Sequence, residues 1–132
     1  MLLNNADWQR FLKISRRILG KGASVSWASD SWCGWTTFGS LQSQLNYWAR
    51  GLPNEEDILE TCTADGGVWM QPFHYEELAH FIIPAEFYWE KVENGIFTCG
   101  HKKQDIVLLS NELHAAGIAH RLTDIILEIK LY

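Results

Sequence analysis

The Asn94-Gly95 dipeptide is the feature that most constrains the fold of this 132-residue chain. Residues 86–92 and 96–101 flank it as two candidate strands. Asn-Gly in this setting is the strongest short-range signal for a two-residue hairpin turn, because both residues accept positive φ angles. The turn fixes a register with three facing pairs: Val92 with Phe97, Glu90 with Cys99, and Tyr88 with His101. The sequence therefore predicts an antiparallel hairpin.

Two other segments have the periodicity of amphipathic helices. In residues 8–19, apolar side chains recur on one face, Asn5 can cap the start and Gly20 can end the helix. The inward stripe of this helix comprises Trp8, Phe11, Leu12, Ile18 and Leu19. A second helix is predicted from about Asp105 to its stop at Gly117, with Ile106, Leu109 and Leu113 facing inward.

The first half of the chain gives weaker patterns between these elements. Residues 24–27 alternate as a short strand does, and residues 29–35 are loop-like because of their Ser, Asp and Gly content. A helix is predicted over residues 38–50 from a stripe of Leu41, Leu45, Trp48 and Leu52. A short helix is predicted from Asn54 to Cys62, with Asn54 as its cap.

The remaining segments favour strands and decide the fold class. Residues 68–73 are predicted as a strand near a sheet edge because of Pro72, whereas residues 74–83 fit either a helix or a strand. One face of a final strand is formed by Ile125, Leu127, Ile129 and Leu131. The last third therefore has the order β-β-α-β. The predicted class is α+β, with a mostly antiparallel sheet and about three to four helices.

Length and composition favour one compact domain over residues 1–132. The length is close to the commonest domain size, and 47% of the residues are apolar, which is ample for a core. No apolar run approaches the ~20 residues of a membrane helix, and no secretory signal precedes the first helix. We therefore expect a cytoplasmic protein with no membrane association.

The cysteines and histidines do not form a recognised metal or catalytic motif. Three widely spaced cysteines, Cys33, Cys62 and Cys99, indicate reduced thiols. A zinc-binding helix places two ligands four residues apart. The histidines instead form two pairs with a spacing of six, His74 with His80 and His114 with His120. The sequence therefore predicts no metal, no cofactor and no catalytic residue.

One group of side chains keeps an enzymatic alternative open. Cys99 and His101 point to the same side of the predicted hairpin, with Glu90 opposite Cys99. A Cys/His pair of this kind can supply a nucleophile and a base. The favoured interpretation is a cross-strand polar cluster without catalytic function.

The charge is distributed very unevenly along the chain. The net charge is −5, yet residues 1–22 carry +4 and residues 51–90 carry −9 with no Lys or Arg. Overall acidity repels phosphate backbones, so nucleic-acid binding is not expected. Like charges in such a run repel one another, and a basic protein partner would relieve that repulsion. A solvated surface that only maintains solubility is the alternative.

The acidic run and nearby tryptophans supply the predicted partner-binding residues. Tryptophan is enriched among interface hot spots, so one of Trp32, Trp35 or Trp69 can be exposed for a partner, although most tryptophans belong to the core. The predicted partner-binding set is Glu55, Glu56, Asp57, Glu60, Asp65, Trp69, Glu76, Glu77, Glu86 and Glu90.

The overall character of the chain resembles that of bacterial immunity proteins. These are the proteins that neutralise toxins of contact-dependent growth inhibition and related systems. The resemblance is carried by two segments, Ser26-Trp27-Ala28-Ser29-Asp30-Ser31-Trp32-Cys33-Gly34-Trp35 and Thr123-Asp124-Ile125-Ile126-Leu127-Glu128-Ile129-Lys130-Leu131-Tyr132. The resemblance implies an antitoxin role, in which an acidic surface binds a toxin domain, often a basic nuclease, and blocks its active site. Because these proteins differ widely in structure, it implies no particular fold.

Three functions remain open at this point. The favoured one is an inhibitor that acts by binding a basic partner. The second is a small cytosolic enzyme with a His or Cys/His site, which a deep pocket gathering two or more histidines would favour. The third is an interaction subunit of a larger assembly.

Overall fold

The central sheet of the molecule has five antiparallel strands: β1 (Cys33–Thr37), β2 (Trp48–Arg50), β5 (Leu78–Pro84), β8 (Arg121–Leu122) and β9 (Ile126–Lys130). Their order across the sheet is β2-β1-β5-β9-β8. The computed structural model describes residues 3–64 and 66–132. Along β5, Phe81 and Ile83 point to the buried face of the sheet and His80 points to the opposite, polar face.

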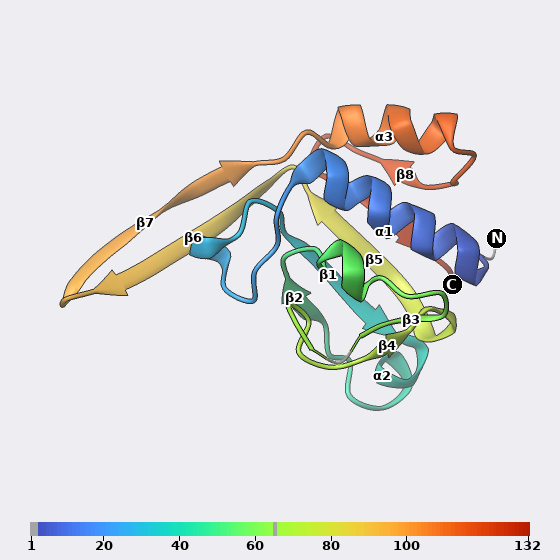
Figure 1. Cartoon of the computed structure of the whole chain (residues 1–132), viewed down its shortest axis with the longest axis horizontal. Helices are drawn as coiled ribbons and strands as arrows, with labels where there is room; N and C mark the ends of the chain where they lie inside the picture. Colours follow the sequence, from blue (N-terminus) through green and yellow to red (C-terminus); the bar gives the residue numbers. More distant parts are fainter. Residues whose placement is uncertain (1–2, 65) are drawn as a thin grey trace.

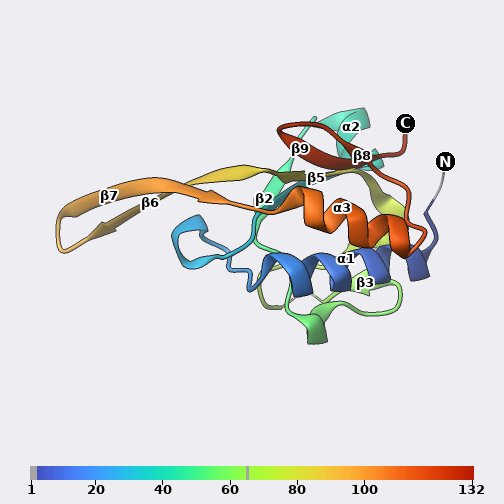
Figure 2. The ribbon, with the colours of Figure 1, turned by 90° about the horizontal axis from the view of Figure 1, so that it is seen from above.

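Two helices, α1 (Asn5–Leu19) and α3 (Ile106–Ala115), lie side by side over the buried face (Figure 1 and Figure 2). Both were predicted, and both are confirmed. A capping box starts α1, and its cap is Asn4 instead of the predicted Asn5. The side chain of Asp105 caps α3, and Gly117 with a φ of 72° follows its end. No helix among the described residues is long and apolar enough to cross a membrane.

Strands β6 (Glu86–Glu93) and β7 (Ile96–Lys103) form a separate two-stranded sheet that projects from the body, and we call residues 86–103 the arm (Figure 1 and Figure 2). All three predicted facing pairs are confirmed. Asn94 and Gly95 turn the chain with φ angles of 52° and 77°. The α+β class is confirmed, and a short β8 lies between α3 and β9 in the predicted β-β-α-β order.

Short elements connect the longer ones. The segment after β2 covers the buried face beside α1, while the segment after α2 reaches the polar face (Figure 1 and Figure 2). These elements are the 3-10 turns η1 (Ser26–Ala28), η2 (Glu55–Asp57) and η3 (Tyr75–Glu77), the short helix α2 (Phe38–Ser43), and the strands β3 (Cys62–Thr63) and β4 (Phe73–His74), which pair with each other.

The prediction of a strand at 24–27 is wrong, and the loop predicted over 29–35 is confirmed only as far as Trp32, because residues 33–35 belong to β1. Cys33 and Trp35 lie on β1 and are fully buried, because β2 and β5 pair with this strand on either side. Pairing with distant strands thus outweighs the local Ser, Asp and Gly content. The 24–27 segment instead leads into η1, and the Trp27 carbonyl accepts a hydrogen bond from the arm.

The helix predicted over residues 38–50 ends at Ser43. Beyond it, Leu45 has a φ of 53° and is 72% exposed, so its side chain leaves the predicted apolar stripe. The hydroxyl of Ser40 accepts a hydrogen bond from the backbone N–H of Asn46, which turns the chain toward β2. A side-chain bond therefore replaces the continuation of the helix.

Two more predicted elements are shorter in the structure, and a third segment is assigned where the sequence left two alternatives open. The short helix predicted over 54–62 is limited to η2. Only the end of the strand predicted at 68–73 forms, as β4, because Met70 has a φ of 65°, which an extended strand does not allow. Residues 74–83, which fitted either a helix or a strand, form η3 and most of β5.

Stacked aromatic rings form the centre of the core. The rings of Trp35 and Trp69 stack at 3.8 Å, and Trp35 also stacks on Phe81 at 6.1 Å. On its other side, Phe81 meets Phe11 of α1 edge-on at 5.2 Å. Trp69 also donates its ring N–H to the carbonyl of Gly51. These contacts join α1, β1, β5 and the segment before β4 in one cluster of buried side chains.

Two glycines allow the chain to cross itself next to this core. A Cβ atom added at Gly22 would lie 1.9 Å from the Leu52 carbonyl oxygen, and one added at Gly51 would lie 2.5 Å from the Gly22 Cα. The N–H of Gly51 donates to the carbonyl of Ala23 across the crossing. Any larger residue here would force the two backbones apart.

We predict that Gly22→Ala lowers the free energy of unfolding by about 3 kcal/mol, because the new methyl group overlaps backbone atoms that cannot rotate away. Urea denaturation of purified protein measures this change. Gly66→Ala is the matched control, since a Cβ there meets nothing within 4 Å. Equal stability of the two variants would contradict the close crossing.

Candidate protein-binding site

The arm has one open face, formed by the even-numbered residues of β6 and the odd-numbered residues of β7. Three large apolar or aromatic side chains are exposed on it: Tyr88 (48%), Val92 (71%) and Phe97 (55%). Ile96 is also exposed at the tip of the arm. Val92 and Phe97 are facing partners, so they form one apolar patch at the outer end. The sequence predicted their pairing but did not identify them as binding residues.

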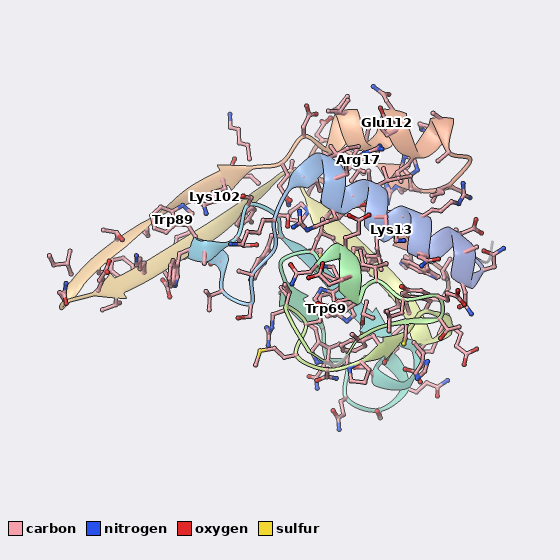
Figure 3. The ribbon with its side chains drawn as sticks, in the orientation of Figure 1. Lys13, Arg17, Trp69, Trp89, Lys102 and Glu112 are labelled. Carbon is pink, nitrogen blue, oxygen red and sulfur yellow. The ribbon has the colours of Figure 1, made fainter. Side chains whose placement is uncertain are left out.

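The inner face of the arm is attached to the body through η1. Lys102 donates from Nζ to the carbonyls of Trp27 (3.1 Å) and Ser29 (2.8 Å), and Figure 3 shows Lys102 close to the loop that carries η1. The Lys91 ammonium lies 4.4 Å from the ring centroid of Trp27. These contacts fix the direction in which the arm projects.

A buried glutamine ties the base of the arm to the central sheet. The Gln104 amide donates to the carbonyls of Trp32 (2.9 Å) and Pro84 (3.0 Å), and its Oε1 accepts from the Trp32 N–H (3.0 Å). Phe87 stacks on Trp32 at the same place, with ring centroids 5.8 Å apart. One side chain thus bonds to the start of β1 and the end of β5, directly after β7. No sequence pattern marked Gln104.

The Cys99, His101 and Glu90 group forms the predicted cross-strand cluster on the open face. The Tyr88 hydroxyl donates to Glu90 at 3.0 Å, and this bond raises the pKa of Tyr88 to about 12. The His101 ring packs against Tyr88 with centroids 5.5 Å apart. All four side chains are exposed on the outside of the arm. They form a row of side chains open to solvent, not an enclosed reaction site.

The predicted acidic residues lie in three separate places. Glu55, Glu56 and Asp57 are on η2, and Glu60 follows them. Glu55 and Glu56 share a groove of about 380 Å³ with three basic residues of α1, namely Lys13, Arg16 and Arg17. Figure 3 shows Lys13 and Arg17 on α1, with Arg17 near Glu112 of α3, whose carboxylate is 3.6 Å away. Cations from the first helix therefore lie close to two of the nine acids of residues 51–90, Glu55 and Glu56.

The other acidic pairs are at opposite ends of β5. Glu76 and Glu77 are exposed on η3, before the strand, while Glu86 and Glu90 are exposed on the arm, after it. At about 3.3 Å per residue, the strand separates the two pairs by roughly 25 Å. Asp65 lies outside the described residues. The structure thus places Glu90 beside the apolar patch, leaves Glu86 at the base of the arm opposite Lys103, and does not bring the other described acids there.

Trp69, the one tryptophan in the predicted set, is not on the surface. It is 3% exposed and stacks on the fully buried Trp35, so both belong to the core. Trp32 is half-buried under Phe87. The prediction of Trp69 as a binding residue is wrong because Trp35 on β1 and Phe81 on β5, both distant in sequence, pack against its ring.

On the polar face of the sheet, His80 is held between two partners. Its Nε2 lies 2.7 Å from Glu128 Oε1, and its Nδ1 lies 2.7 Å from the Tyr47 hydroxyl. Glu128 is only 6% exposed, and its other oxygen accepts from Arg121 at 3.1 Å. Both ring nitrogens of His80 are therefore hydrogen-bonded within the protein, one to a carboxylate and one to a phenol hydroxyl.

His120 is similarly engaged at the end of α3. Its Nδ1 lies 2.8 Å from the Ile118 carbonyl, which can only accept, so Nδ1 carries the proton and Nε2 accepts from the Ser110 hydroxyl at 2.6 Å. His114 lies beside it, with ring centroids 4.5 Å apart. Burial lowers the pKa of His120, His114 lowers it further, and the bond to Ile118 opposes both effects.

No group of three His, Cys, Asp or Glu side chains among residues 3–64 and 66–132 is arranged to hold a metal ion. His120 lines a hollow of about 190 Å³ with Arg121 and Glu128, and it is the only histidine there. Of the six-residue pairs, His114 and His120 meet because the chain turns back after α3. His74 and His80 are on different sheets.

We predict that Gln104→Ala lowers the free energy of unfolding by about 3 kcal/mol, because it leaves the Trp32 N–H and the carbonyls of Trp32 and Pro84 without their partner. Thermal or urea unfolding measures the effect. Gln71→Ala, at an exposed position, should change stability by less than about 0.5 kcal/mol. A neutral Gln104→Ala would show that the arm does not depend on this side chain.

We also predict that protonation of His120 makes the free energy of unfolding depend on pH. Because the folded-state pKa of His120 is below its ordinary value of about 6.5, its neutral form contributes stability above that pH, and this contribution is lost as the pH falls. In urea titrations from pH 7.5 to 5, His120→Gln should lose less stability than the wild type does. The difference in slope should be at most about 1.4 kcal/mol per pH unit. Gln71→Ala, at an exposed position without a titrating group, should keep the wild-type slope; identical slopes for all three proteins would rule out this role of His120.

Comparison of the chain with protein-family models, curated proteins and solved structures finds no match.

Proposed function

We propose that this chain is a protein-binding module that docks on a partner through the open face of its arm and neutralises that partner, as an immunity protein does. The observation that carries the proposal is the exposed apolar patch of Val92 and Phe97, with Tyr88 on the same face, on a hairpin that extends away from the body (Figure 1). A patch at the outer end of an arm can enter a concave site on another protein.

Burial of this patch against a partner would contribute favourable binding free energy. Burying a Val or Phe side chain contributes about 1.5–3 kcal/mol, and aromatic anchors dominate most binding surfaces. The contacts of Lys102 and Gln104 hold the base of the arm before any partner arrives. Because little ordering is then needed on binding, more of the contact energy is available as affinity.

Charge supports a basic partner. Glu90 is exposed on the same face as Tyr88 and Val92, while Glu86, at the base of the arm, faces Lys103 and lies 3.9 Å from His101. Carboxylates at the rim of an apolar contact speed the approach of a basic surface and set its orientation. A toxin domain of the basic nuclease type has the required charge. The proposal includes a cytoplasmic location and no cofactor, membrane or nucleic-acid ligand.

We favour binding over catalysis because the hollow that His120 lines holds no second histidine among the described residues, and the Cys99 and His101 side chains are exposed on the arm. A subunit of a larger assembly could use the same arm. The two roles differ in one measurable property, since an inhibitor abolishes the activity of its partner and an assembly subunit does not.

We predict that Val92→Asp with Phe97→Asp weakens binding to the partner captured from the native host at least about 100-fold, equivalent to about 3 kcal/mol. Surface plasmon resonance measures the affinity, and circular dichroism checks the fold. Val107→Asp is the matched control, because Val107 is an exposed valine on α3. Unchanged affinity of the arm variant would overturn the proposal.

The same partner tests for neutralisation. Its enzymatic or toxic activity is titrated with the wild-type chain, and activity should disappear at one equivalent. The arm variant should leave the activity intact at this ratio. Full partner activity in the saturated wild-type complex would favour the assembly role instead.

A further inference from the structure

The outer edge of β7 is the longest free strand edge in the described part of the chain. The central sheet ends in β2 and β8, which have three and two residues, whereas β7 has eight residues and pairs only with β6. The 3-10 turn η1 contacts β6 and lies on the side of β6 away from β7 (Figure 1). Natural proteins normally shorten or protect such edges with charges, prolines or bulges, because an open edge accepts another strand.

The outer half of β7 lacks this protection. Residues 96–100 contain no charge and no proline, and the guarding lysines, Lys102 and Lys103, lie at the base. An isolated two-stranded hairpin is only marginally stable in water, and a third strand would increase its stability. The unprotected half is also the part farthest from the body (Figure 2).

Hairpin geometry shows which backbone groups are available. In a two-residue turn, the flanking residues Glu93 and Ile96 are joined by the turn hydrogen bond, and bonded and non-bonded pairs then alternate along the ladder. Phe97, Cys99 and His101 therefore belong to non-bonded pairs, and their N–H and C=O groups point away from β6. An added strand could form about six hydrogen bonds with these three residues.

We propose that β7 accepts an extended segment of the partner as a third strand of the arm, a segment with an apolar residue opposite Phe97 and a Lys or Arg opposite Cys99. This inference rests on the proposed function and specifies how the partner binds. An apolar residue next to Phe97 extends the patch that Phe97 forms with Val92.

The basic residue follows from charge and reach. Glu90 faces Cys99 across the hairpin, and the short Cys99 side chain leaves the space above it open. A strand added to β7 lies about 10 Å from β6, two strand spacings away. Extended Lys or Arg and Glu side chains together span that distance, so the cation can reach the Glu90 carboxylate over Cys99.

Hydrogen exchange of the full chain tests the proposal with a defined probe. The probe is a seven-residue peptide in which Val and Lys alternate with Thr, at millimolar concentration; its control has Glu in place of Lys. The Lys peptide should slow exchange at the amides of Phe97, Cys99 and His101, leave Thr98 and Gly100 unchanged, and bind at least fivefold more tightly than the Glu peptide. No change at the three outward amides, or equal binding of both peptides, would overturn the proposal.

A pair of variants at one residue tests the captured partner. Cys99→Pro removes an outward N–H that a sheet-edge proline can spare, while Cys99→Ala keeps it. Cys99→Pro should bind at least tenfold more weakly, and Cys99→Ala should bind as the wild type does. If Cys99→Pro folds and retains full affinity while the Val92/Phe97 variant loses it, edge pairing is wrong and the proposed function stands. If Cys99→Pro does not fold, the peptide experiment decides.

A second copy of the chain is the competing occupant of this edge. In that case the three outward amides would already be protected in the free protein at high concentration. Their protection would fall on dilution, together with the sedimentation coefficient. That result would assign the edge to self-association and overturn pairing with a heterologous partner.

Discussion

The aromatic stack around Trp35 is the interaction on which the rest of the structure depends. It joins a strand that is unremarkable in sequence to Phe81 on β5, and to Trp69 in a segment with little regular structure. Through Phe81 it also holds Phe11 and hence α1 against the sheet. Each of these large rings buries considerable apolar surface, and their stacked and edge-on contacts fix relative orientation as well as proximity. This packing holds α1 and the segment before β4 against the central strands.

Features decided by neighbouring residues could be predicted from the sequence, and features decided by distant contacts could not. The hairpin register depends on the turn at Asn94-Gly95, and both long helices depend on their own caps and stripes. β1 forms because strands from elsewhere pair with it on both sides. The crossing of Gly22 and Gly51 leaves no local pattern at all, since each glycine is required by the backbone near the other. Tertiary packing outweighs local preference at these places.

The same distinction applies to the candidate site. A run of acids along the chain predicts an acidic surface only if folding keeps those residues together, and here β5 separates Glu77 from Glu86. The cations of α1 then share a groove with Glu55 and Glu56, so the charge asymmetry seen along the sequence is reduced in space. Pairing on the arm could be predicted, whereas its exposure could not, because exposure depends on the arm leaving the central sheet.

The arm combines an ordered base with an incomplete outer half, and both features fit the proposed binding function. Its base is ordered by Gln104, by Lys102 and by the stacking of Phe87 on Trp32. Its outer half has only two strands, an exposed apolar pair and an unprotected edge, each of which is costly or hazardous in water when left uncovered. A domain with enough buried apolar side chains for a central core does not need these features for folding. The base of the arm holds the free edge of β7 in place before a partner binds. A partner that adds a strand there loses little binding free energy to ordering of the arm, so more of the contact energy appears as affinity.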